Sequence, residues 1–182
     1  PCCHYIHPFR EAVQHLVHAG IRAGDVMSLT AHVPPPMAPL ICEPWARRQA
    51  PASGYDGKWG LPYCLALLLT DGAVTVESFE AEPRAEVVAI ARRMDWAPME
   101  GHGFPDRFAA QLEVETPTGR HVAEVTSVRG GSDRPVAEGE ILAKFRANAA
   151  RRLSPEAAGR LEAALLGLGA APDLSEVAAA LA

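Results

Sequence analysis

Apolar residues near the start of the chain recur at the spacing of an α-helix. The positions that share one helical face are Phe9, Ala12, Val13, Leu16 and Val17. Pro8 suits the first turn of such a helix, and Gly20 suits its end. The pattern therefore predicts an amphipathic helix between these two residues.

Other segments alternate between apolar and polar residues, as half-buried strands do. One runs over residues 27–33 and ends at three prolines, and a short one lies near residues 94–97. Residues 108–115 and about 120–128 flank Pro117-Thr118-Gly119, which predicts an antiparallel hairpin. No period is sustained from Met37 to Asp56, so we predict a long irregular loop there.

Further helices are predicted from the remaining apolar pattern. They cover about residues 61–70, a segment opened by Pro83, about residues 137–153, a segment with Ser154 as N-cap, and a short segment after Asp173. The chain thus has the order of an α+β protein, with a small, mostly antiparallel sheet of about four strands packed with helices. We expect one domain over residues 1–182.

Composition narrows the class of protein. Hydrophobic residues make up 48% of the chain and the net charge is −5, which is typical of a soluble globular protein. Apolar runs such as Leu65–Leu69 are far shorter than the roughly 20 residues of a membrane span. A role in nucleic-acid binding is disfavoured, because the sequence has no basic tract. The four cysteines form no regular disulfide framework, so we expect reduced thiols in a cytoplasm.

Candidate chemistry is concentrated before two helices. His7 precedes Pro8 at a helix amino end, where N–H groups favour an anion, so His7 is either a proton carrier beside a bound carboxylate or a packed cap. Lys58 either holds a carboxylate as a point charge or lies in solvent. Tyr63 either shuttles a proton or lies at a core boundary.

Two other groups have competing interpretations. The turn that begins at Arg129 and contains Gly130-Gly131 either binds an anion through backbone N–H groups or only connects a strand to a helix. Adjacent Cys2 and Cys3 with His4 and His7 carry zinc-ligand atoms, but no second ligand pair accompanies them. We therefore predict no metal site.

These motifs, taken in order, resemble the carboxy-terminal part of the MmgE/PrpD family. The segments that carry the resemblance are Pro1–Phe9, Tyr55–Ala66, Asp71-Gly72, the turn from Val128 to Pro135, and Lys144-Phe145-Arg146. That family includes 2-methylcitrate dehydratases, cis-aconitate decarboxylases and iminodisuccinate epimerases. The resemblance covers nearly the whole chain and implies the smaller of the family's two domains, a lid.

The resemblance also implies roles for particular residues. Tyr63 matches the family's lid tyrosine, and His7 matches a histidine that faces the cleft, whereas the family's lysine upstream of Pro1 is outside this chain. It implies a lyase that needs no metal or organic cofactor and removes a proton next to a carboxylate. Tyr63 and His7 are then the expected catalytic residues, with Lys58 and Arg129 binding substrate.

The expected partners follow from the same interpretation. They are a small di- or tricarboxylate, an upstream helical domain, and a second copy in a homodimer of the longer protein, with no nucleic acid or membrane. Because the chain opens on Pro1 within a motif, we expect a fragment that is inactive alone. The alternative is a non-catalytic module that binds carboxylates or dimerises.

Overall fold

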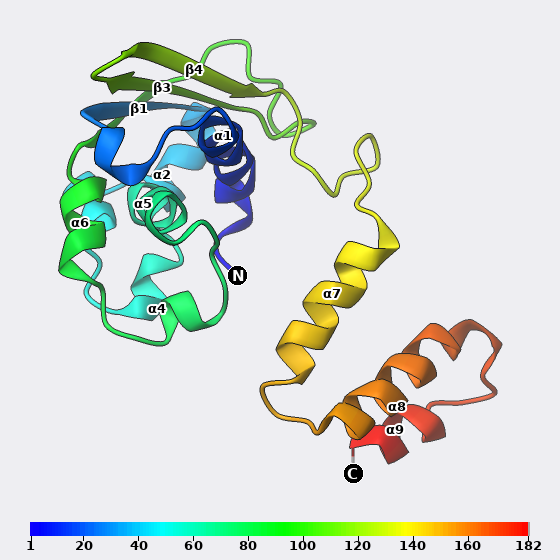
Figure 1. Ribbon diagram of the computed structural model, residues 1–182. Coiled ribbons are helices and arrows are strands. Elements are labelled where there is room, and N and C mark those ends of the chain that lie inside the picture. The colour runs from blue at the N-terminus through cyan, green and yellow to red at the C-terminus, as the bar shows by residue number, and fades with distance from the viewer. Residues whose placement is uncertain (182) are drawn as a thin grey trace. The chain divides into compact units, whose positions relative to one another are not determined.

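The computed structural model describes residues 1–181, which divide into two compact units (Figure 1). The larger unit comprises residues 1–134 and contains the sheet, and the smaller unit begins at Pro135 and is helical. Within residues 1–181, the helices are all too short or too polar to cross a membrane.

The sheet of the larger unit has four strands in the order β2-β1-β3-β4. Their bounds are Met94–Pro98 for β2, Ser28–Val33 for β1, Ala110–Thr116 for β3 and Gly119–Val125 for β4. The predicted hairpin is the antiparallel pair β3–β4, and β1 is also antiparallel to β3. The pair β1–β2 is parallel, so the sheet is mixed. The predicted α+β fold is confirmed, because helices and a four-stranded sheet are both present.

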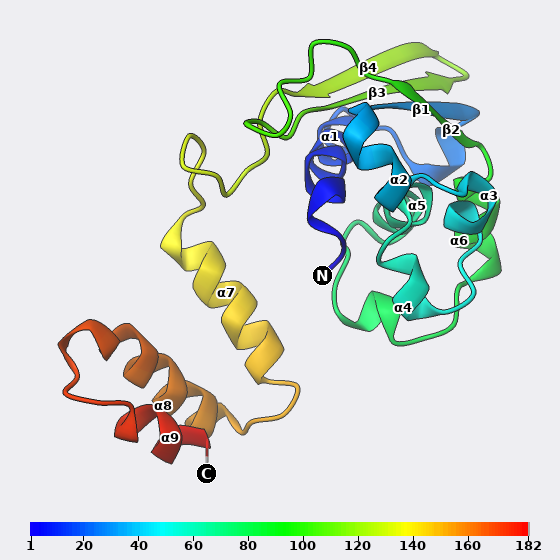
Figure 2. The same ribbon diagram turned by 180° about the vertical axis from the view of Figure 1, so that it is seen from behind.

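One face of the sheet carries the core. Leu29 lies opposite Val114 and Ala31 opposite Leu112, and all four side chains are buried. The helices of the larger unit gather on this face (Figures 1 and 2). Since strand side chains alternate between faces, the polar residues between these positions point away from the helices.

Helix α1 (His7–His18) packs against β3 and β4 through the apolar stripe predicted from its sequence, including buried Phe9, Val13 and Leu16. Helix α5 (Leu61–Asp71) packs against α1 and against α6 (Ala85–Ala91). Its residues from Leu61 to Leu69 are all buried, as expected of a helix that is apolar on every side. Gly72 ends α5 in a left-handed conformation with φ of 73°.

The prediction of a long irregular loop from Met37 to Asp56 was wrong. The chain there forms 3₁₀-helix η3 (Pro35–Met37) and short helices α2 (Ala38–Ile41), α3 (Trp45–Gln49) and α4 (Gly54–Gly57). Each is too short to show a period in the sequence, and tertiary contacts hold them. Ile41 and Cys42 are fully buried, and Trp45 Nε1 donates to the Met94 carbonyl oxygen at 3.2 Å.

Three further single turns complete the larger unit, namely η1 (His4–Ile6), η2 (Ala23–Asp25) and η4 (Glu77–Phe79). The smaller unit contains α7 (Glu138–Ala149), α8 (Pro155–Leu166), η5 (Leu168–Ala170) and α9 (Ser175–Leu181). Ser154 is the N-cap of α8, as predicted, because its side chain accepts the Ala157 N–H. Arg146 joins α7 to α8 through two contacts with Glu162 of 2.8 and 2.5 Å.

Candidate functional site

His7 and Arg129, which are far apart in the sequence, line one cavity of about 380 Å³ in the larger unit. Its walls come from the start of α1, the segment before β3 and the turn after β4. The lining residues are His4, His7, Asp106, Arg107, Phe108 and the run from Ser127 to Asp133. The lining thus combines two guanidinium groups and two imidazoles with the carboxylates of Asp106 and Asp133.

His7 is the first residue of α1, as predicted, but η1 runs directly into that helix. The His7 backbone N–H therefore donates to the His4 carbonyl oxygen and does not offer the free helix end that we expected for an anion. The side chain is different: Nε2 is buried and has no hydrogen-bond partner among residues 1–181. A buried polar atom without a partner indicates a place for a ligand or water.

The turn that carries Arg129 is closed by backbone hydrogen bonds. The Gly130 N–H donates to the Arg134 carbonyl oxygen at 2.7 Å, and the Arg134 N–H donates to the Gly131 carbonyl oxygen at 3.2 Å. Gly130 has φ of 101°, a conformation that favours glycine. Because this N–H already has a partner, it does not serve as a free donor for an anion.

Arg134 fastens this turn to α1. Its Nη2 lies 2.6 Å from Glu11 Oε1 and its Nη1 lies 3.3 Å from Glu11 Oε2, which is a bidentate pair. Nη1 also donates to the Ser127 carbonyl oxygen. The carboxylate of Asp133 accepts a hydrogen bond from the Ser127 side chain, which lowers the pKa of Asp133. These contacts hold the Arg129 turn beside His7.

Arg10 is a cationic neighbour that the sequence analysis missed. It lies one turn after His7 on α1, and its Nε is also buried without a hydrogen-bond partner among residues 1–181. Arg10, His7 and Arg129 line a smaller cavity of about 150 Å³. The spacing of three residues between His7 and Arg10 was the available signal, since such residues share a helix face.

Cys2 also lies beside His7. The side chains of Cys64 and His7, together with the positive charge of Arg10, lower the pKa of Cys2 to about 4. Burial and the negative charge of Cys2 raise the pKa of Cys64. The surroundings thus favour the charged form of Cys2 and the neutral form of Cys64.

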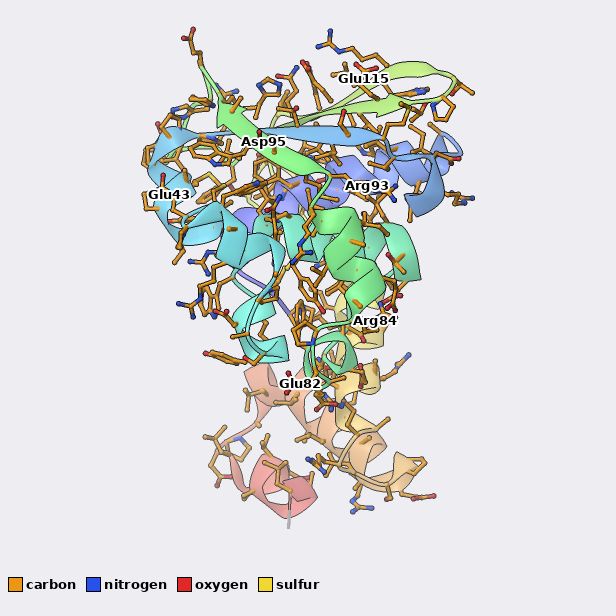
Figure 3. The ribbon with its side chains drawn as sticks, turned by 90° about the vertical axis from the view of Figure 1, so that its left-hand side faces the viewer. Glu43, Glu82, Arg84, Arg93, Asp95 and Glu115 are labelled. Atoms are coloured by element: carbon orange, nitrogen blue, oxygen red, sulfur yellow. The ribbon has the colours of Figure 1, made fainter. Side chains whose placement is uncertain are left out.

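Tyr63 lies elsewhere in the larger unit. Its side chain is 1% exposed, and burial raises the pKa of its phenol, which accepts a hydrogen bond from the Arg84 backbone. Tyr63 lines a separate cavity of about 400 Å³ together with Asp71, Glu82 and Arg84. Glu82 and Arg84 come from the segment before α6 (Figure 3). The structure does not bring Tyr63 into the cavity of His7 and Arg129.

Lys58 lies at the end of α4. Its Nζ is 5.3 Å from the centre of the Tyr55 ring and 5.8 Å from that of Phe79, and its carbonyl oxygen accepts the Cys3 N–H at 2.9 Å. The ammonium group thus contacts aromatic faces. Its predicted role in substrate binding stays a prediction, as do those of Tyr63, His7 and Arg129.

The first residues of the chain pack into an aromatic cluster at the cavity rim. The His4 ring meets Phe108 edge to face with centres 4.7 Å apart, and Tyr5 contacts Phe104 and Phe108 at 5.7 Å each.

In residues 1–181, histidines, cysteines and carboxylates nowhere form a group of three that could hold a metal ion.

The family of this chain is established by comparison with known proteins. Residues 1–168 match the family described as the MmgE/PrpD C-terminal domain, so the chain belongs to the MmgE/PrpD family. The resemblance noted in the sequence is thereby confirmed, including its assignment to the carboxy-terminal domain. A search of curated proteins finds no match to the chain.

Proposed function

We propose that this chain is the lid domain of an MmgE/PrpD-type lyase that acts on small di- or tricarboxylates. In this proposal the lid works with an upstream helical domain, in a cytoplasmic homodimer, and the cavity of His7 and Arg129 receives the substrate. Family membership supports the proposal. The observation that carries it is the buried, unpartnered His7 Nε2 in a residue that shares a cavity with two arginines.

The residues of this cavity suit proton removal next to a carboxylate. Such a reaction builds negative charge on the substrate, and positioned cationic groups lower the energy of that state. Arg129 and Arg107 would pair with substrate carboxylates, since the guanidinium fork matches a carboxylate. His7 Nε2 would exchange a proton with the substrate or with the leaving group.

Tyr63 and Lys58 enter the proposal separately. Tyr63 lines a cavity with Arg84, so a substrate group reaching that cavity would meet a phenol and a guanidinium. Lys58 would add a positive charge to a carboxylate near α4. Both roles rest on the match to the family's motif.

The substrate cavity is tested by titrating citrate into the chain in a calorimeter. His7→Gln and Arg129→Gln should each weaken the affinity about tenfold or more, because a hydrogen bond to a charged group contributes about 1.5–3 kcal/mol. Arg92→Gln removes an exposed positive charge at the end of α6 and is the matched control, expected within about twofold of wild type. Unchanged affinity in both cavity variants would refute the site.

Catalysis is tested in the protein that includes the upstream domain. Tyr63→Phe should lower kcat for a methylcitrate-like substrate by about 10²- to 10⁴-fold with little change in stability if the phenol shuttles a proton. If Tyr63 is only a core residue, the variant instead loses about 1 kcal/mol of stability and keeps its rate. Citrate binding without any turnover by that longer protein would favour the non-catalytic carboxylate-binding module.

A further inference from the structure

Two cavities of the larger unit adjoin each other at the start of α1. One of about 380 Å³ and one of about 150 Å³ share His7, Val128 and Arg129 in their walls. The smaller cavity continues along α1, where its walls are formed by Arg10, Glu11 and Gln14. Pockets for drug-sized ligands span about 300–1,000 Å³. The smaller cavity therefore has room for only one branch of a ligand whose body lies in the larger cavity.

Arg10 is the cationic residue that only the smaller cavity contains. Its Nε atom is buried and has no hydrogen-bond partner among residues 1–181. His7 Nε2, one helical turn earlier, is also buried and equally without a partner in that part of the chain. Because a guanidinium group carries only donors, the group that satisfies Arg10 has to be an acceptor.

The balance of charge favours an anion in the smaller cavity. Histidines aside, the larger cavity has equal numbers of basic and acidic side chains, namely Arg107, Arg129, Asp106 and Asp133. The smaller cavity has Arg10 and Arg129 against the single carboxylate of Glu11. Glu11 is already the bidentate partner of Arg134, at 2.6 and 3.3 Å, so its charge is largely offset. Positive charge is therefore in excess around Arg10.

A carboxylate is the anion that best matches this arginine. The positive charge of Arg10 also acts on the thiol of Cys2. A single sulfur atom, however, does not present the two parallel oxygen atoms that pair with the guanidinium fork, whereas a carboxylate does. The smaller cavity is thus suited to a carboxylate at the end of a short arm.

We propose that Arg10 binds one carboxylate arm of the substrate in the smaller cavity and thereby makes the site selective for tricarboxylates over dicarboxylates that lack this arm. The inference rests on the function proposed above, because the rest of the substrate would lie in the cavity of His7 and Arg129. Those two residues line both cavities, so an arm held by Arg10 would keep the substrate beside His7 Nε2. Arg10 itself binds and does not transfer a proton, since its guanidinium group stays protonated.

The experiment compares the binding of citrate and of citramalate to the chain in a calorimeter near pH 7.5. Citramalate, used as each enantiomer, is citrate with one terminal carboxylate replaced by hydrogen, so the comparison isolates one arm. Wild type should bind citrate about tenfold or more tightly than citramalate, because the arm adds hydrogen bonds between charged groups. Arg10→Gln should reduce this ratio to about twofold or less by weakening citrate binding, with the affinity for citramalate nearly unchanged.

Two matched variants show that the ratio depends on the guanidinium group of Arg10. Arg10→Lys keeps the positive charge without the fork and should give an intermediate ratio. Arg92→Gln removes an exposed positive charge at the end of α6 and should keep the wild-type ratio. A variant that merely loosens the fold weakens the binding of both compounds, so the ratio separates recognition of the arm from stability.

The proposal is overturned if wild type binds citrate and citramalate with equal affinity, a result that does not depend on whether a variant folds. It is also overturned if Arg10→Gln keeps the wild-type ratio, even when His7→Gln and Arg129→Gln weaken the binding of both compounds. That pattern refutes the role of Arg10 and leaves the proposed substrate cavity standing.

The opposite pattern separates the two proposals in the other direction. If Arg10→Gln abolishes the preference for citrate while His7→Gln and Arg129→Gln bind as wild type, Arg10 recognises the arm and the larger cavity is not the substrate site. A wild-type chain that binds neither compound overturns both proposals.

Discussion

Removing the ion pair between Arg134 and Glu11 should both destabilise the larger unit and weaken binding in the cavity of His7 and Arg129. The pair is bidentate, with Nη2 to Oε1 at 2.6 Å and Nη1 to Oε2 at 3.3 Å. The side chain of Glu11 is 14% exposed and that of Arg134 is 39% exposed. Arg134 is therefore open to solvent, whereas its partner carboxylate is largely covered.

The exposed fractions of the two side chains determine how large the coupling free energy of the ion pair should be. Exposed ion pairs contribute about 0.2–1 kcal/mol, whereas removing one partner of a fully buried pair costs about 3–5 kcal/mol. The pair of Arg134 and Glu11 lies between these limits, so we expect a coupling free energy of about 1–2 kcal/mol. Arg134→Ala should cost about 1 kcal/mol more than Glu11→Ala, because Arg134 also donates to the Ser127 carbonyl oxygen.

The assay is a double-mutant cycle of Arg134→Ala, Glu11→Ala and the double variant in urea, followed by tryptophan fluorescence. Trp45, Trp59 and Trp96 all lie in the larger unit, so the signal reports its unfolding. The control cycle removes Arg84 and Asp71, whose side chains are 41% and 32% exposed and should couple by less than about 1 kcal/mol.

A second measurement separates the positioning role from stability. Arg134→Ala should weaken citrate binding in the folded chain, because the Arg129 turn loses its attachment to α1, and Arg134→Lys should restore part of the affinity. The reasoning is refuted if the Arg134–Glu11 coupling is no larger than that of the control pair. It is also refuted if Arg134→Ala binds citrate as wild type does.

Two further changes follow from the same structure. Gly54→Ala should destabilise the larger unit by about 3 kcal/mol or more, because a Cβ there would lie 2.4 Å from the Phe79 carbonyl oxygen and 2.5 Å from that of Ala81. The control is Gly24→Ala, whose Cβ would have no atom within 4 Å and which should fold as wild type. Thermal melts compare the two, and equal melting temperatures would contradict the expected clash. Hydrogen bonds from Arg47 and from the Ala52 N–H lower the pKa of Asp56 in the folded chain below 3.8. Ionised Asp56 therefore stabilises the folded chain above pH 3.8, and this stabilisation is lost as the pH falls through the lower pKa of the folded state. Urea unfolding at pH 5 and pH 3 should show this loss in wild type and a smaller one in Asp56→Asn; equal losses would refute it.

The sequence determined those parts of the protein whose pattern is local. The apolar stripe of α1, the wholly apolar α5 with its Gly72 end, the hairpin of β3 and β4, and the Ser154 cap all follow from residues close together in the chain. The order of the motifs along the chain was also sufficient to identify the family. Such features depend on backbone hydrogen bonds and side-chain periods within about ten residues of each other.

Only the tertiary structure decided what depends on distant contacts. The short helices between Pro35 and Gly57 form because neighbouring elements bury them, and the parallel pair β1–β2 requires a long crossing through helices. His7 lines a cavity together with Arg129, across a separation that leaves no periodic trace in the sequence. Tyr63 lies in a different cavity because its position on α5 turns it toward Arg84, whereas the next residue, Cys64, turns toward Cys2. Successive helical residues point in different directions, and which neighbour each one meets is set by packing.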